Sequence, residues 1–358
     1  NQTFLDSEKI IFLKGFEKLS YETRISLVIN VSLLVGISIL IYFHVDILYV
    51  AILFLITRVI GFWLGLKYAS QFLVNISFKP TYPKFGEARN KILVYGFHLV
   101  FSYLFFQLDT ILLAIFKGDY EIGIYQSVFK IIMIFLVIPE IFVNALLPVL
   151  SRLNTENPLQ WTTVAHLMNK ILVFAIIPIT IFLFVFAERI ISLIYGLSEY
   201  SESVMVLRIF AIILLVRFNL ETFALMLTTS NKQKIRMYVV IIASVLNLTL
   251  NSFLIPGHGV NGAALVSLIT NLFVGVIYIY MNRKLFIKWM VNSKVILLIL
   301  ISLTVALVLW EFDSQIIFYL SPIFGIIYLV LIYLYYLTED DRYLLFSDKI
   351  KILTFKQK

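Results

Sequence analysis

The sequence predicts an all-α protein that crosses a membrane many times. Of its 358 residues, 61% are hydrophobic and only 14% are charged, and the mean hydropathy is +0.96. Soluble globular proteins are roughly half apolar and a quarter charged. Since so few charges cannot cover a water-facing surface, most of the surface must face lipid.

Ten segments are long and apolar enough to span a bilayer, because about 30 Å of hydrocarbon requires roughly 20 apolar residues in a helix. They comprise residues 25–43, 47–66, 92–115, 122–147, 167–186, 204–222, 237–255, 260–281, 295–310 and 316–337. A β-barrel would instead need strands of about ten residues that alternate apolar and polar side chains. Segments such as LLVGISILIYF are apolar on every face, so all ten are predicted to be helices.

The basic residues predict how the helices are oriented. Of the 29 Lys and Arg residues, 22 fall in loops and ends on one side, whereas Lys117 and Arg189 fall on the other and five lie within spans. The side rich in Lys and Arg is normally cytoplasmic. We therefore expect both ends of the chain on the cytoplasmic side, together with Lys79 and Asn231. Ser198 is expected on the outer side. Topology explains the net charge of +8, so no nucleic-acid partner is expected.

The longest internal break, residues 67–91, contains Pro80 and Pro83 and separates two spans from the following eight. It is the candidate domain boundary. The chain begins with Asn1 rather than Met and continues with an amphipathic stretch. Because two spans make a poor lobe, we expect earlier helices to precede Asn1.

Two blocks of the sequence carry a family pattern. The first, residues 107–153, reads QLDTILLAIFKGDYEIGIYQSVFKIIMIFLVIPEIFVNALLPVLSRL. Its matching elements are Asp109-Thr110, Gly118-Asp119, Gly123-x-Tyr125, Pro139 and Pro148. A second block adds, in the same order, Tyr195-Gly196, Leu207-Arg208, Arg217, Asn231-Lys232-Gln233, Asn247, Pro256 and Gly262-Ala263-Ala264. Together these elements resemble the polysaccharide flippases, the Wzx-type exporters of lipid-linked oligosaccharide in the MATE-like multidrug/oligosaccharidyl-lipid/polysaccharide superfamily.

The resemblance covers residues 15–281 and implies that the ten spans correspond to helices 5 to 14 of a fourteen-helix, two-lobe fold. Residues 1–66 would then be the remainder of the N-terminal lobe, with two helices after an amphipathic link. Residues 67–91 would form a cytoplasmic linker, and 92–281 the C-terminal six-helix lobe. Residues 282–358 would form two peripheral helices and a basic cytoplasmic tail.

The resemblance also implies a function. The chain would flip a polyprenyl-diphosphate-linked oligosaccharide from the cytoplasmic to the outer leaflet by alternating access, for a surface polysaccharide such as the O-antigen of lipopolysaccharide. Its location would be the bacterial cytoplasmic membrane, and its partners the lipid-linked oligosaccharide and membrane lipids. A polysaccharide polymerase or other assembly proteins are candidate protein partners. No cofactor is expected.

Three basic residues inside spans are the candidate substrate-binding residues: Arg58, Arg217 and Lys130. An ionisable side chain in hydrocarbon costs about 2.5–3.5 kcal/mol, so such residues usually line a cavity or form pairs. Arg58 and Arg217 lie near mid-membrane, and a guanidinium suits a diphosphate. The alternative for Arg217 is an ion pair with Glu221, four residues later on the same helical face.

Acidic residues inside spans are candidates for ion coupling or for structural pairing: Asp109, Glu140 and Glu221. Asp109 and Lys130 lie at similar depths on consecutive antiparallel spans, which predicts an interhelical ion pair. Alternatively, Asp109 or Glu140 binds H⁺ or Na⁺ and couples transport to an ion gradient. Glu140 follows Pro139, which can kink its helix, although packing explains this position equally well.

Enzymatic functions lack their usual parts. The chain has no cysteine, its four histidines are scattered, and no phosphate-binding GxxxxGK[ST] motif is present. We therefore expect no catalytic residue and no metal site. Two other functions stay open: a cation-coupled multidrug antiporter of the same superfamily, and a membrane-embedded polysaccharide polymerase or acyltransferase.

Overall fold

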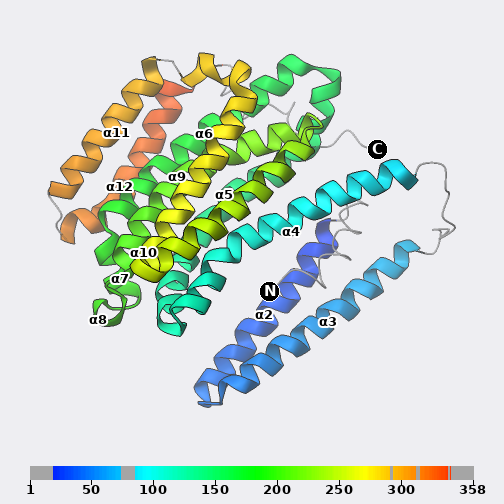
Figure 1. Ribbon diagram of the computed structural model, residues 1–358, viewed down its shortest axis with the longest axis vertical. Helices are drawn as coiled ribbons and strands as arrows, with labels where there is room; N and C mark the ends of the chain where they lie inside the picture. Colours follow the sequence, from blue (N-terminus) through cyan, green and yellow to red (C-terminus); the bar gives the residue numbers. More distant parts are fainter. Residues whose placement is uncertain (1–18, 74–84, 291–292, 312–314, 338, 340–358) are drawn as a thin grey trace. The chain divides into compact units, whose positions relative to one another are not determined.

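The computed structural model describes residues 19–73, 85–290, 293–311, 315–337 and 339, which form helices joined by turns, without a strand among them (Figure 1). The all-α class is confirmed. The chain divides into two compact units, residues 1–84 and 85–358. The predicted amphipathic link before residue 19, residues 74–84 of the predicted linker, and the basic tail beyond 339 lie outside the described residues.

The first unit is a hairpin of two long helices, α2 (Leu19–Tyr42) and α3 (Ile47–Leu73). Its core consists of Ile25, Ile29 and Leu33, packed against Leu53, Leu64 and Tyr68. Gly36 faces α3 so closely that a Cβ there would lie 2.5 Å from the Leu53 side chain. A small residue thus lets the two helices approach each other, as is common in membrane helix pairs.

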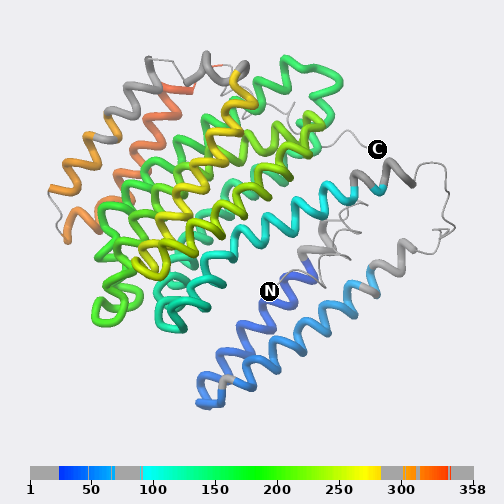
Figure 2. The backbone as a smooth tube through the Cα atoms, in the orientation of Figure 1, coloured from blue at the N-terminus to red at the C-terminus, as the bar shows by residue number. Residues whose placement is uncertain are grey.

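The second unit is a larger helical bundle. Its elements are α4 (Phe85–Phe116), α5 (Asp119–Glu156), α6 (Pro158–Val185), α7 (Ala187–Ile194), α8 (Leu197–Tyr200), α9 (Ser203–Thr229), α10 (Gln233–Met290), α11 (Ser293–Glu311), α12 (Gln315–Leu331) and the π-helical turn η2 (Ile332–Tyr336). Helix α9 contacts α5, α6 and α10, and α4 runs along α10 (Figure 2). The main core lies around α5, α6 and α9, while α11 and α12 contact α6.

Each predicted span lies inside a helix or overruns its end by one residue. Among the described residues, eight helices are long and apolar enough to cross a membrane, and one of them, Gln233–Arg283, contains two predicted spans. The two halves of α10 meet at Gly259, whose φ of 51° and ψ of −135° are not helical. A backbone with positive φ favours glycine because glycine has no Cβ. The chain is thus an all-α polytopic membrane protein.

Several helices extend beyond the predicted spans. Helix α6 begins at Pro158 rather than at residue 167, because the Asn157 side chain caps it by accepting from the Gln160 amide at 3.1 Å and proline suits the first helical position. Likewise α3 continues to Leu73 and α4 begins at Phe85. The described parts of the predicted linker are therefore helical, since residues such as Lys, Ala and Gln favour a helix outside hydrocarbon as well.

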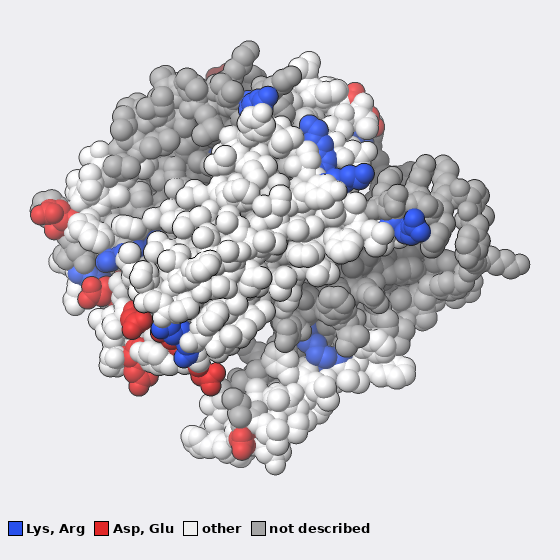
Figure 3. Space-filling view, viewed as in Figure 1, with Lys and Arg blue, Asp and Glu red and all other residues white. Residues whose placement is uncertain are grey.

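The surface agrees with a lipid environment. Large apolar side chains such as Leu34, Trp63, Phe253 and Tyr335 are exposed, far more than an aqueous surface would tolerate. The middle of the second unit carries few charges in the view of Figure 3, and acidic side chains gather over the end where α7 and α8 lie.

Candidate functional site

A buried carboxylate, Asp109 of α4, is the centre of a polar cluster in the second unit. Asp109 is 3% exposed. Its Oδ2 accepts hydrogen bonds from Tyr125 Oη of α5 at 2.7 Å and from Ser267 Oγ of α10. Its Oδ1 accepts from Asn247 Nδ2 at 3.0 Å and from Asn251 Nδ2 at 2.6 Å, both in α10. Four neutral donors from two other helices therefore hold this carboxylate.

The α10 residues of this cluster follow helical spacing. Asn247 and Asn251 are one turn apart, so their amides point to the same side, and Asn251 Nδ2 donates to Asn247 Oδ1 at 3.0 Å. Asn251 Oδ1 is buried and has no hydrogen-bond partner among the described residues. Buried polar atoms normally have a partner, so this oxygen is an exception within the cluster.

Arg217 of α9 is linked to this cluster through the second half of α10. Its Nε donates to Asn271 Oδ1 at 3.0 Å, and its guanidinium carbon lies 4.3 Å from the centroid of the Phe106 ring. Asn271 Nδ2 in turn donates to the backbone oxygen of Ser267 at 2.8 Å. One helical turn, from Ser267 to Asn271, thus connects the carboxylate of Asp109 to the guanidinium of Arg217.

Arg217 lines two adjoining cavities of the second unit. The smaller, about 30 Å³, also contains Asp109, Tyr125, Ser267 and Asn271, and has space for about two water-sized molecules. The larger, about 260 Å³, is lined by Arg217, Glu221, His98, Arg236, Tyr278 and further residues of α4, α9 and α10. Two guanidiniums and one carboxylate give the larger cavity a positive character.

The predicted ion pair between Asp109 and Lys130 is wrong. Lys130 is exposed, and Asp109 is bound by four neutral donors instead. Lys130 follows Tyr125 by five residues, which at 100° per residue places it about 140° around α5 from the face that meets Asp109. Similar depth in the membrane therefore does not bring Asp109 and Lys130 together, because Lys130 lies on a face of α5 that does not meet Asp109.

The predicted alternative for Arg217, an ion pair with Glu221, is also not formed. In the described part of the chain no Arg217 nitrogen lies within 4.0 Å of a Glu221 carboxylate oxygen, and Arg217 bonds to Asn271 instead. Glu221 is half-buried and lines the larger cavity. The two charges thus share a cavity without direct contact.

Two further predicted site residues are Glu140 and Arg58. Glu140 is exposed on α5, while the preceding Pro139 is buried. Arg58 is a half-buried residue of α3, in the first unit, and its guanidinium carbon lies 5.6 Å from the Phe54 ring centroid. Neither residue lines the two cavities around Arg217.

Sequence reasoning missed several polar residues of the site: Asn251, Ser267, Asn271, Arg236 and His98. A signal was present, because Asn247 and Asn251, and again Ser267 and Asn271, are spaced four residues apart within otherwise apolar spans. Such spacing places both members of each pair on one helix face. Arg236 lies outside the predicted spans and therefore reads as a loop residue in the sequence, although it is in the first turn of α10.

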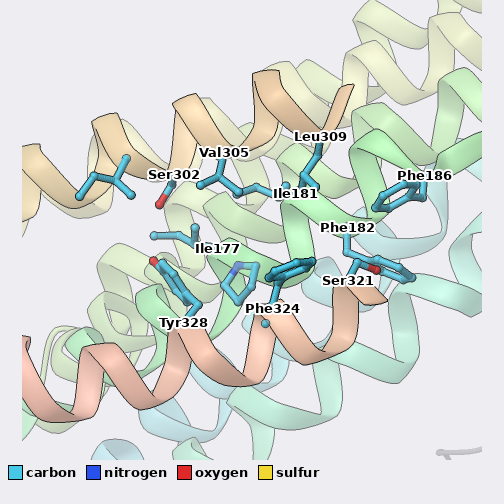
Figure 4. A pocket seen from close by; sticks show the side chains of 13 residues that line it. Ile177, Ile181, Phe182, Phe186, Ser302, Val305, Leu309, Ser321, Phe324 and Tyr328 are labelled. Atoms are coloured by element: carbon cyan, nitrogen blue, oxygen red, sulfur yellow. The ribbon is translucent and has the colours of Figure 1, made fainter. Parts of the chain in front are cut away.

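A third cavity, of about 70 Å³, lies between α6, α11 and α12 and is mainly apolar (Figure 4). Its wall includes Ile177 and Phe182 of α6, Val305 of α11, and Phe324 and Tyr328 of α12. It lacks a charged side chain. Among the described residues, no group of three or more His, Cys, Asp and Glu side chains is arranged to hold a metal ion.

Comparison with known proteins gives two matching families and a similar structure. The family described as MatE matches residues 95–253, and the family described as Polysaccharide biosynthesis protein matches residues 7–154. The solved structure "Lipid II flippase MurJ, inward closed conformation" matches with a TM-score of 0.69 and 16% identity, over 97% of this chain and 72% of that chain. At this identity the likeness shows a shared fold. Comparison with curated proteins gave no match.

Proposed function

We propose that the chain, which matches the families described as MatE and Polysaccharide biosynthesis protein, flips a polyprenyl-diphosphate-linked oligosaccharide across the membrane. The cargo moves from the cytoplasmic to the outer leaflet by alternating access, without a covalent step. The observation that carries this proposal is the guanidinium of Arg217, which lines both cavities inside the bundle.

The geometry around Arg217 supports an anionic cargo. Nε is held by Asn271 and the guanidinium face rests on Phe106, so the side chain is fixed before a ligand arrives. A fixed guanidinium loses less conformational freedom on binding, and its planar fork matches phosphate oxygens. Since the cargo must leave again, a cavity that admits water also keeps the interaction weaker than in a dry interior.

A multidrug antiporter is supported less well. Such a protein binds cationic, drug-sized molecules, which need pockets of about 300–1,000 Å³. The buried carboxylate Asp109 already accepts four hydrogen bonds and faces a cavity of about 30 Å³. The larger cavity contains two guanidiniums against the single carboxylate of Glu221, which repels a cationic cargo.

Asp109 is instead suited to a coupling ion. A proton or Na⁺ is small enough for the cavity of about 30 Å³ beside it, where Tyr125, Ser267 and Asn271 supply further oxygen atoms. Hard cations prefer such oxygen ligands. Binding of a cation would change the charge seen by Ser267 and, through the turn to Asn271, the position of Arg217. Coupling through Asp109 is therefore proposed together with anion binding at Arg217, whereas the exposed Glu140 has no such surroundings.

The proposed location is the bacterial cytoplasmic membrane, with both ends of the chain in the cytoplasm. The excess of Lys and Arg on one side supports this orientation. In this orientation the larger cavity, which reaches Arg236 near the start of α10, extends toward the cytoplasmic side.

The experiment is display of surface glycan by cells that carry the full-length gene with Arg217→Gln or Arg217→Lys. We expect display to fall at least about tenfold with Gln and less with Lys, because Lys keeps the charge but loses the fork. Arg208→Gln is the matched control, since Arg208 lies on the same helix but contacts the Phe184 carbonyl and Trp310 away from the cavities. Normal display by Arg217→Gln at normal protein abundance refutes the proposal.

A further inference from the structure

A second guanidinium, that of Arg236, lines the larger cavity together with Arg217. Arg236 is in the first turn of α10, and its Nη1 donates to Thr228 Oγ1 of α9. Its Nε is buried and has no hydrogen-bond partner among the described residues. Tyr278 and His98 line the same cavity. Arg236 is thus a second cation that lines a space of about 260 Å³, together with two further polar groups.

The two guanidiniums are held at different positions along α9, Arg217 by its own place in that helix and Arg236 through its bond to Thr228. Thr228, which holds Arg236, follows Arg217 by eleven residues, or about 16 Å along the helix axis at 1.5 Å per residue. Glu221 lies between them on α9 and lines the same cavity. A diphosphate that bridged both guanidiniums would lie against this carboxylate and be repelled by it. The cavity therefore offers two anion sites in series rather than one bidentate site.

We propose that Arg236 is the first anion-binding site of the transporter, and that it receives the diphosphate of the cargo before Arg217 does. This inference rests on the proposed function and its orientation, in which the α10 start faces the cytoplasm. The diphosphate of a lipid-linked sugar lies at the headgroup level of the inner leaflet, where a guanidinium one turn into the membrane can reach it. The N-terminus of α10 also favours an anion, because free backbone amides and the helix dipole point there.

The competing explanation is structural, with Arg236 only tying α9 to α10 through Thr228. The two roles differ in what Thr228→Val does. Removing the hydroxyl abolishes the tie but leaves the guanidinium in the cavity, whereas Arg236→Gln removes the charge. If Arg236 binds the anion, only the second change weakens anion binding.

The experiment is isothermal titration calorimetry of the purified full-length protein in detergent, with farnesyl diphosphate as the probe. We expect Arg236→Gln to raise the Kd about tenfold, since the variant loses a charge-assisted hydrogen bond to the diphosphate. Thr228→Val should stay within about twofold of the wild type. If Arg236→Gln lowers the yield of folded protein, Arg236→Lys replaces it in the titration. We expect it to raise the Kd about threefold, because lysine lacks the planar fork.

The outcomes separate this inference from the proposed function. Loss of affinity in Arg217→Gln with unchanged affinity in the Arg236 variants overturns the first-site role and leaves the proposed function standing. Equal weakening by Thr228→Val and Arg236→Gln shows a structural tie and also overturns it. Absence of probe binding to the wild type refutes both, because the diphosphate site itself is then missing.

Discussion

The structure predicts that Asp109→Asn leaves the protein folded but stops transport. In the native cluster, Oδ1 faces two amide donors and Oδ2 faces the hydroxyls of Tyr125 and Ser267. Asparagine keeps one oxygen for the amides. The hydroxyls can rotate and accept from its new NH₂ group, since a hydroxyl is both donor and acceptor. All four contacts are therefore retained in neutral form.

The expected change in stability is a small difference between two terms. A hydrogen bond to a charged group contributes about 1.5–3 kcal/mol and a neutral one about 0.5–1.5 kcal/mol, so four bonds lose roughly 4 kcal/mol in total. Burial of a charge costs several kcal/mol, and asparagine does not have this cost. The two terms nearly cancel. Asp109→Leu, by contrast, removes the acceptor of four buried donors. Asn251 Nδ2 keeps Asn247 Oδ1 and the Tyr125 and Ser267 hydroxyls keep each other, but each donor left unsatisfied costs about 1–3 kcal/mol, which is a large part of the stability of a typical domain.

The assay compares the amount of folded protein in the membrane with glycan display in the same cells. Asp109→Asn should give near-normal abundance and lost display, and Asp109→Leu should lose the protein itself. Lys130→Gln should rescue neither variant, because Lys130 is exposed and lies on a different face of α5 from Tyr125. The reasoning is refuted if Asp109→Asn is as depleted as Asp109→Leu, or if Lys130→Gln restores its abundance.

Three further predictions follow from the fold. Cysteines introduced at Ser198 and at Lys232, both exposed, should be labelled from the outside and from the inside respectively, and labelling of both from one side would contradict the topology. Arg58→Gln should reduce glycan display at normal abundance, and unchanged display would remove Arg58 from the candidate substrate-binding residues. Gly259→Ala should destabilise the purified protein by about 1–3 kcal/mol and lower its Tm, because the backbone at Gly259 suits only glycine. Gly257→Ala should leave the Tm unchanged, because a Cβ added at Gly257 has nothing within 4 Å.

Sequence alone determined the class of the protein and the positions of its helices. Runs of about 20 apolar residues have one stable form in hydrocarbon, because every backbone amide must find its partner within the same helix. The predicted spans therefore coincide with helices in the structure. Helix ends were predicted less well, as at Pro158 and Phe85, because outside hydrocarbon a helix ends where capping and local propensity decide.

Only the tertiary structure decided which polar residues meet. Asp109 and Arg217 could be identified as important from the sequence, because a charge inside an apolar span requires an explanation. Their partners depended on the rotation of each helix about its axis, which depth along a span does not specify. Tyr125 rather than Lys130 therefore faces Asp109 from α5, Asn271 rather than Glu221 bonds to Arg217, and Arg236 enters the cavity of Arg217.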